Sequence, residues 1–215
     1  MSADDLGRKR RALKGRLLAL GLAAVAGLGI GGGAYLWRAR GTASAPAGLA
    51  SVGRPQIGGD FQLVDEQGRA ADQSLLRGKW SAVFFGYTYC PDFCPATLQT
   101  LQAATAQLGP RAEDLQVLFI SVDPARDTPE ALRSYLAGFD FPGGVHGLTG
   151  TPAQLEAAAK AWRAYYQRRG DGPDYVMDHV TTIYLMDPQG RFDRPLSHSL
   201  DPKQMAGQIS AAMGA

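Results

Sequence analysis

Short and nearly unbroken apolar runs recur after residue 80, separated by longer segments in which apolar residues return every three or four positions. Runs of this length predict strands buried in a sheet, and the longer spacing predicts helices with one apolar face. A further short apolar segment lies at 61–64. The strands that this pattern predicts are 81–89, 115–122 and 181–186, with a short edge strand at 191–195.

Two Thr-Pro pairs mark helix starts, at Thr128-Pro129 and at Thr151-Pro152. Thr suits the N-cap, where its hydroxyl accepts a backbone N–H, and Pro suits the first helical position, where the missing N–H costs nothing. The predicted helices run from about 95 to 108, from 129 onward, from 152 to about 166, and from about 202 to 213.

The order of these elements predicts the fold class. Strands joined through a helix should be parallel, whereas 181–186 and 191–195, joined by a four-residue turn, should be antiparallel. A mixed sheet flanked by helices in this order is typical of the thioredoxin-like α/β fold, which we assign to residues 56–215. In that fold the third strand runs antiparallel beside the first. Val180 is therefore expected to lie next to Tyr89.

An uncharged stretch of 21 residues, from Leu17 to Trp37, precedes this domain. About 20 apolar residues cross a hydrocarbon core of roughly 30 Å, and the aromatic residues at the end of the stretch suit a membrane interface. The basic tail, 1–16, should stay in the cytoplasm. We therefore expect one transmembrane helix at 17–37, a flexible linker at 38–55, and the main domain across the membrane.

A cleaved signal peptide is the alternative interpretation of the same stretch. Ala43-Ser44-Ala45 has the small residues of a cleavage site, but the apolar run exceeds the usual length of about 7–15 residues, and Pro46 would directly follow the cut. Either arrangement exports the domain. Arg outnumbers Lys by 17 to 5, which favours a bacterium with a GC-rich genome. The expected location is the bacterial inner membrane, with the domain in the periplasm.

Charge and composition exclude several classes of function. Residues 1–40 hold eight basic and two acidic side chains, so the remaining 175 residues hold 14 basic and 18 acidic ones. The net charge of +2 therefore comes from the tail, and the main domain lacks the basic face that nucleic-acid binding requires. Hydrophobic residues at 45% and charged residues at 20% indicate a globular chain. Two cysteines are too few for a disulfide scaffold.

Both cysteines, Cys90 and Cys94, follow the first predicted strand in the segment CPDFCP. At i, i+4 spacing on a helical turn their sulfurs face the same side. Cys94 precedes Pro95, which suits the first helical position, so the helix dipole is expected to favour a thiolate at Cys94. A structural disulfide is the simplest alternative, but a loop of three residues removes little chain entropy. The spacing favours a redox or metal-binding role.

Three histidines compete for a place beside this pair. His179 precedes the third strand, where the topology predicts proximity to the cysteines, whereas His146 and His198 fall in predicted loops. Met177 shares a strand face with His179 and is a candidate extra ligand, although a packing role is commoner. Asp178 is a candidate partner that orients the imidazole, although Asp before a strand is more often solvated.

Two thiolates and one imidazole form a soft ligand set of low coordination. Soft ligands select Cu(I) or Zn(II) over Mg or Ca, and three ligands are one fewer than a closed structural zinc site uses. The set therefore favours an open copper site that can pass its ion on.

Three blocks of sequence, in order, resemble the Sco/SenC family of copper chaperones. They are Gly78-Lys79-Trp80 with 85–95 (FGYTYCPDFCP), 121–129 (SVDPARDTP), and 174–179 (DYVMDH) with 184–190 (YLMDPQG). The likeness covers about residues 57–212, after a single anchor as in the family.

This resemblance implies a thioredoxin-like domain that binds one copper ion, Cu(I) or Cu(II), through Cys90, Cys94 and His179. It also implies a role in building the dinuclear copper centre of cytochrome c oxidase subunit II. The implied partners are that subunit, periplasmic copper donors or thiol reductants, and the membrane. Two positions depart from the pattern, since many members have His in place of Tyr89 and Ser in place of Val180. Neither is a predicted ligand.

A copper chaperone is not an enzyme, and two catalytic alternatives stay open. One is a thiol–disulfide oxidoreductase that reduces a partner's cysteines, or a redox sensor built on the same pair. Such oxidoreductases use Cys-x-x-Cys and a cis-proline, whereas this chain has one residue more between the sulfurs and has Val180-Thr181 at the proline position. The other is a thiol peroxidase, for which no suitable arginine is evident near the first strand. A pure interaction module leaves the Cys/Cys/His convergence unexplained.

Overall fold

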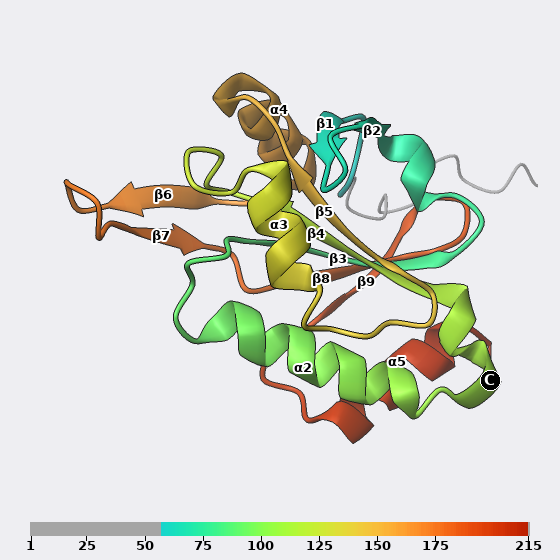
Figure 1. The fold of residues 1–215 in the computed structure, drawn as a ribbon. Helices are drawn as coiled ribbons and strands as arrows, with labels where there is room; N and C mark the ends of the chain where they lie inside the picture. Colours follow the sequence, from blue (N-terminus) through green and yellow to red (C-terminus); the bar gives the residue numbers. More distant parts are fainter. Residues whose placement is uncertain (1–56, 215) are drawn as a thin grey trace, which may run out of the picture. The chain divides into compact units, whose positions relative to one another are not determined.

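The computed structural model describes residues 57–214, which carry the predicted globular domain (Figure 1). The predicted basic tail (1–16), transmembrane helix (17–37) and linker (38–55) lie outside the described residues. Within 57–214, no helix has the length and apolar character needed to cross a membrane.

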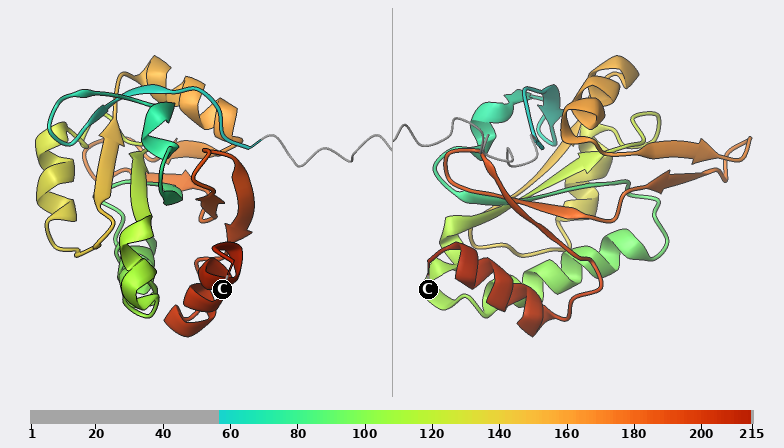
Figure 2. Two further views of the ribbon diagram at one scale, coloured as in Figure 1. Left: turned by 90° about the vertical axis from the view of Figure 1, so that its right-hand side faces the viewer. Right: turned by 180° about the vertical axis from the view of Figure 1, so that it is seen from behind.

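A seven-stranded mixed sheet forms the centre of the domain, in the order β2-β1-β5-β4-β3-β8-β9 (Figures 1 and 2). β3, β4 and β5 are parallel, whereas β8 runs antiparallel beside β3 and β9 antiparallel beside β8. This arrangement confirms the thioredoxin-like mixed sheet and the antiparallel third strand. The bounds of its strands are β1 Gln62–Asp65, β2 Ala70–Asp72, β3 Trp80–Gly86, β4 Leu115–Ser121, β5 Val145–Thr149, β8 Ile183–Met186 and β9 Phe192–Leu196.

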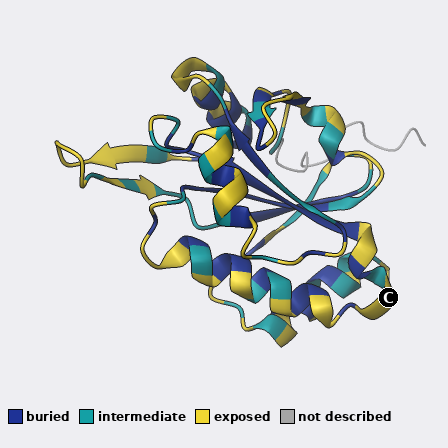
Figure 3. Cartoon of the chain, viewed as in Figure 1, coloured by how far each residue is buried: buried dark blue, intermediate teal, exposed yellow. Residues whose placement is uncertain are grey.

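Helices cover both faces of the sheet, and its strands form the buried core (Figure 3). Phe84 and Phe85 of β3 pack on opposite faces of the sheet, because successive side chains of a strand point to opposite sides. Phe85 meets Trp162 of α4, with ring centroids 6.1 Å apart. Phe84 packs on Phe119 at 5.1 Å, and Phe119 in turn packs on Tyr135 of α3. The helices are α2 Phe93–Ala106, α3 Pro129–Leu136, α4 Pro152–Trp162 and α5 Pro202–Ala212, with 3-10 turns η1 Gln73–Leu76 and η2 Gly109–Asp114.

Both Thr-Pro helix starts are confirmed. Thr128 caps α3 by accepting the N–H of Ala131 at 3.2 Å. Thr151 caps α4 by accepting the N–H of Gln154 at 3.3 Å, and the Gln154 side chain accepts the Thr151 N–H at 2.8 Å. This reciprocal pair is a capping box, which satisfies two backbone donors at the helix start.

Several predicted boundaries were wrong. The strand predicted at 81–89 ends at Gly86, and the strand predicted at 181–186 begins at Ile183. The helix predicted to reach residue 166 ends at Trp162. It stops there because Arg163 takes a left-handed conformation, with φ of 53°, which turns the chain away from the helix axis.

Besides β1 and β2, for which no strand was predicted, two strand regions escaped the pattern. The glycine-rich segment that was predicted as a loop around His146 forms β5, in which a Cβ on Gly147 would lie 2.8 Å from Leu136 of α3. The second region is a separate two-stranded sheet of β6 (Tyr166–Arg169) and β7 (Val176–His179). Its strands are four residues long, polar and mostly exposed, so they lack the apolar run that marks a buried strand.

Candidate metal centre

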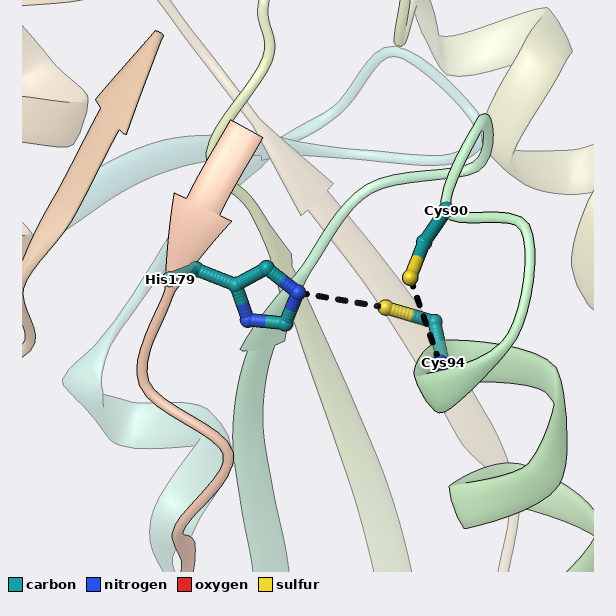
Figure 4. A group of neighbouring side chains, drawn as sticks. All are labelled: Cys90, Cys94 and His179. Atoms are coloured by element: carbon teal, nitrogen blue, oxygen red, sulfur yellow. Dashed lines mark hydrogen bonds between the residues drawn. The ribbon is translucent and has the colours of Figure 1, made fainter. Parts of the chain in front are cut away.

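Side chains from two separate elements converge at one end of the sheet. One metal-ligating atom from each of Cys90, Cys94 and His179 lies within 4.8 Å of the others (Figure 4). Nε2 of His179 is 3.7 Å from Sγ of Cys94. Among the described residues this is the one such group of three His, Cys, Asp or Glu side chains. The structure thus brings together the three residues predicted as ligands.

The fold produces this convergence as the topology predicted. β3 pairs antiparallel with β8, with Val83 opposite Tyr184. The end of β3, which leads into the cysteine loop, therefore lies beside the start of β8, which follows His179. A hairpin before β8 delivers the imidazole, and the first turn of α2 delivers the second sulfur.

The two cysteines occupy different positions at the start of α2. The helix begins at Phe93 after the N-cap Asp92, so Cys94 is the second helical residue. The free N–H of Cys94 points to Sγ of Cys90 at 3.5 Å. Cys90 therefore receives the N–H that a helix start leaves unpaired, and the favourable end of the helix dipole acts on its sulfur.

This arrangement corrects the predicted site of the thiolate, which is Cys90 instead of Cys94. A hydrogen bond from the Cys94 thiol lowers the pKa of Cys90 against the opposing effect of burial, and His179 and the Cys94 N–H lower it further. The pKa of Cys94 is raised because its thiol donates to the Cys90 sulfur and because it is fully buried. The prediction failed because it took Pro95 as the first helical residue, whereas it is the third.

His179 presents one nitrogen to the sulfurs and uses the other to fix its ring. Nδ1 lies 2.8 Å from the carbonyl oxygen of Val180. A carbonyl can only accept, so Nδ1 carries a proton. Nε2 faces the sulfurs: it offers a lone pair when the ring is neutral and donates to the Cys90 sulfur when the ring is protonated. Burial lowers the pKa of His179, but hydrogen bonds with Cys90 and the Val180 carbonyl outweigh it and raise that pKa.

The other residues considered near the site have different roles. Asp178 does not orient the imidazole: it pairs with Arg169 at 2.7 Å on the exposed face of the hairpin. Met177 lines the same cavity of about 360 Å³ as Cys90 and His179. His146 lies 3.9 Å from Glu66, away from the group of three. His198 packs its ring against Phe93 and is not part of that group either.

Several supporting residues were not predicted from the sequence. Gly86 leaves room for the second sulfur, since a Cβ there would lie 2.7 Å from Sγ of Cys94. The buried Asp127 accepts hydrogen bonds from the hydroxyls of Thr88 and Ser121, each at 2.6 Å. Arg126 lies over the rings that follow β3, 4.7 Å from the centroid of Tyr89, so an arginine does lie near the end of the first strand. The signal for both charged residues was the block SVDPARDTP, whose contacts the sequence alone does not define.

This chain has a thioredoxin-like domain in which a histidine lies beside two cysteines at the end of the sheet. That arrangement defines a class of metal-binding thioredoxin relatives. Comparison with known proteins identifies the family within that class. The family model described as SCO1/SenC matches residues 50–214, and the chain belongs to this family.

Individual relatives show how far the likeness extends. Protein SenC of Rhodobacter capsulatus is 41% identical over 177 residues, which are 82% of this chain and 76% of that protein. Mitochondrial SCO2 of Saccharomyces cerevisiae is 38% identical over 155 residues, 70% of this chain and 51% of that protein. The chain thus spans about half the length of this mitochondrial relative. The structure of Bradyrhizobium japonicum ScoI with copper bound aligns with a TM-score of 0.66 and 39% identity, over 73% of this chain and 99% of that one.

Proposed function

We propose that this protein is a membrane-anchored copper metallochaperone that binds one copper ion through Cys90, Cys94 and His179. The observation that carries the proposal is the convergence of two sulfurs and a free imidazole nitrogen within 4.8 Å. The solved structure of ScoI, a relative with copper bound, supports copper as the ion. The proposed role is assembly of the dinuclear copper centre of cytochrome c oxidase subunit II, as the family resemblance implies.

The ligand set suits an ion that is carried and then released. Two sulfur ligands and one imidazole are soft enough for Cu(I) and leave coordination positions open. A partner's thiolate can enter at an open position before a ligand of this chain leaves, so the ion is never free. The cavity beside Cys90 and His179 provides the approach. The step is ligand exchange without turnover of a substrate, so no enzymatic activity is required.

The remaining assignments follow the sequence. Residues 1–16 are proposed as a cytoplasmic tail, 17–37 as the transmembrane anchor, 38–55 as a flexible linker and 56–215 as the copper-binding domain. This places the domain in the periplasm of a bacterium, at the inner membrane. There it would meet periplasmic copper donors, thiol reductants and the oxidase subunit.

Copper stoichiometry tests the ligand set. The reduced full-length protein in detergent, titrated anaerobically with Cu(I) against a competing chelator, is expected to hold one copper per chain. Cys90→Ala and His179→Ala should each weaken binding by more than the roughly 10–100-fold typical of changes outside the ligand shell. His146→Ala is the matched control, because His146 contacts Glu66 elsewhere, and should bind as the wild type does. Undiminished binding by His179→Ala would show that another group supplies the third ligand.

The unequal cysteines favour one second candidate, a thiol–disulfide oxidoreductase acting on the partner's copper-ligand cysteines. The lowered pKa of Cys90 beside a buried Cys94 thiol is the arrangement of an attacking and a resolving thiol. In that reaction the Cys90 thiolate attacks a partner disulfide and releases one partner thiolate. Cys94 then displaces the second, so this chain is oxidised to a disulfide while the partner is reduced.

His179→Ala distinguishes the two functions, because dithiol exchange does not need an imidazole. Two results together would favour the oxidoreductase. The protein would bind no copper, and His179→Ala would reduce a disulfide-bonded subunit II fragment as fast as the wild type does. A redox sensor using the same pair would show reversible oxidation without net reduction of that fragment.

A further inference from the structure

His179, the residue that separates this site from a simple dithiol, lies on an element outside the main sheet. β6 and β7 pair with each other, with Tyr166 opposite His179, and form their own two-stranded sheet. Their hairpin projects beyond the main sheet in Figure 1 and in the right-hand view of Figure 2. Most of its residues are exposed. The short connection to β8 brings His179 to this end of the sheet, and side-chain contacts to the hairpin determine its position there more finely.

One tyrosine ties this hairpin to the turn that follows β4. Tyr175, directly before β7, donates its hydroxyl to Oδ1 of Asp123 at 2.6 Å. Asp123 is 2% exposed, so the accepting carboxylate is buried, whereas Tyr175 is half-buried. Hydrogen bonds to an ionised carboxylate are stronger than neutral ones. The guanidinium carbon of Arg126 lies 3.6 Å from the centroid of the Tyr175 ring, and that of Arg168 lies 3.9 Å from it. Both separations are within the range of cation–π attraction.

Arg126 connects this tyrosine with the imidazole itself. Its Nε donates to Oδ2 of Asp123 at 2.5 Å, which fixes the guanidinium in place. The same guanidinium lies 5.7 Å from the ring centroid of Tyr87, a buried residue. Tyr87 meets the His179 ring nearly at a right angle, with centroids 5.7 Å apart. Contacts therefore reach the hairpin both just before β7 and at its last residue.

The same turn also contacts the cysteine half of the site. Asp127 accepts hydrogen bonds from the hydroxyl and the N–H of Thr88, two residues before Cys90. The turn is closed by a hydrogen bond from the Asp127 N–H to the carbonyl oxygen of Asp123 at 2.9 Å. The five residues 123–127 are here termed the 123–127 turn. They contact the segment that leads to Cys90 and the hairpin that carries His179.

We propose that the 123–127 turn positions the copper site by holding His179 at a fixed distance from Cys90 and Cys94. The positioning residues are Asp123 and Arg126 in the turn and Tyr175 before β7. This inference rests on the proposed function, because it concerns the geometry of the copper ligands. Two thiolates can retain copper at reduced affinity, whereas the hairpin has to bring the imidazole to the ion. Loss of the Tyr175 contact should therefore leave copper on the sulfurs and displace the histidine.

Tyr175→Phe is the sharpest test, because it removes one hydroxyl and keeps the ring against Arg126. Tyr165→Phe is the matched control on the same hairpin, since its hydroxyl donates to Gln167 at 2.6 Å instead of to the turn. The first measurement needs no metal: amide hydrogen exchange at residues 176–180 of the full-length apo-protein. Exchange is expected to be roughly tenfold faster in Tyr175→Phe, the size expected for one hydrogen bond to a charged group. Tyr165→Phe should exchange as the wild type does.

The second measurement reports the copper ligands directly. In the Cu(II)-loaded protein, nitrogen hyperfine coupling in the electron paramagnetic resonance spectrum reports the imidazole, and sulfur-to-copper charge-transfer absorption reports the thiolates. Tyr175→Phe and Arg126→Lys should lose nitrogen coupling and retain thiolate absorption. Unfolding midpoints close to the wild-type value would show that the change is local.

The possible outcomes separate this inference from the proposed function. Wild-type exchange and wild-type nitrogen coupling in both variants would overturn the positioning role while leaving the copper site intact. A wild-type protein that binds no copper would overturn the proposed function and, with it, the role of the turn in positioning copper ligands. Faster exchange accompanied by loss of nitrogen coupling supports both.

Discussion

Cys90 precedes α2 and Cys94 lies in its first turn. Because of this difference in position, the two sulfurs have different acidities. Cys90 accepts the N–H of Cys94 at the start of α2, whereas Cys94 is fully buried and donates its thiol. A sulfur that receives donors from a helix start is stabilised as a thiolate. At the scale of the residue, the site is therefore already asymmetric before any metal binds.

This asymmetry predicts the pH dependence of alkylation. In the reduced apo-protein, iodoacetamide should modify Cys90 and spare Cys94. Because the pKa of Cys90 is lowered, the thiolate persists as the pH falls, and its reaction rate should stay nearly flat between about pH 8 and pH 6. An ordinary thiol, with a pKa of about 8.5, slows roughly tenfold per unit over this range. Peptide mass spectrometry identifies the modified residue, and faster labelling at Cys94 would contradict the assignment.

The space behind the Cys94 sulfur is free only because Gly86 has no side chain, which gives a second prediction at this scale. A Cβ at Gly86 would lie 2.7 Å from both Sγ of Cys94 and a ring carbon of Phe119. Gly86→Ala should therefore lower the free energy of unfolding by about 1–3 kcal/mol through overpacking, and should weaken copper binding by moving the sulfur. Urea unfolding and the chelator competition measure the two effects.

Gly207 provides the control for that substitution. It lies in the middle of α5, and a Cβ there would meet nothing within 4 Å. Gly207→Ala should raise the free energy of unfolding by about 0.5–1 kcal/mol, because alanine is the better helix former. Equal effects of the two substitutions would show that the close approach at Gly86 does not matter.

At the scale of elements, the sequence predicted those that obey a clear hydrophobic period or carry a cap. β3 and β4 are continuous apolar runs, and α3 and α4 begin at their Thr-Pro pairs. The fold class assigned from the order of these elements placed the third strand beside the first. That step alone brought His179 to the cysteines, so the three members of the site were predictable from topology.

The elements that the pattern missed are the ones whose stability comes from tertiary contacts. β6 and β7 are short and exposed, and their polar composition resembles that of a loop. The contact between Tyr175 and Asp123 joins residues 52 positions apart, so no local pattern reports it. For the same reason the partner of the His179 ring was not predicted: the Val180 carbonyl serves, and a backbone carbonyl has no sequence signal.

At the scale of the whole molecule, the arrangement of charge matches a tethered carrier. The six basic side chains of residues 1–16 and the mildly acidic domain belong on opposite sides of a membrane under the proposed topology. If residues 38–55 form the proposed linker, its 18 residues would span on the order of 20–25 Å on average, from about 5–6 Å times the square root of its length. Under that proposal the copper site would stay close to membrane-bound partners, whose effective concentration the tether would raise.

The anchor itself gives the last prediction. If residues 17–37 cross the membrane, the full-length protein should sediment with inner membranes and resist extraction by alkaline carbonate. Removal of 17–37 should prevent export, because the same segment would direct it. Intact mass distinguishes the anchor from a cleaved signal peptide: an anchored chain keeps its first 45 residues, whereas cleavage after Ala45 would leave Pro46 at the amino terminus. Protease added to intact spheroplasts should digest the domain, because a periplasmic domain is exposed on their outer surface. A domain that resists this protease would contradict the periplasmic assignment. A soluble, cleaved form that still binds copper would leave the chaperone proposal standing and remove the membrane from it.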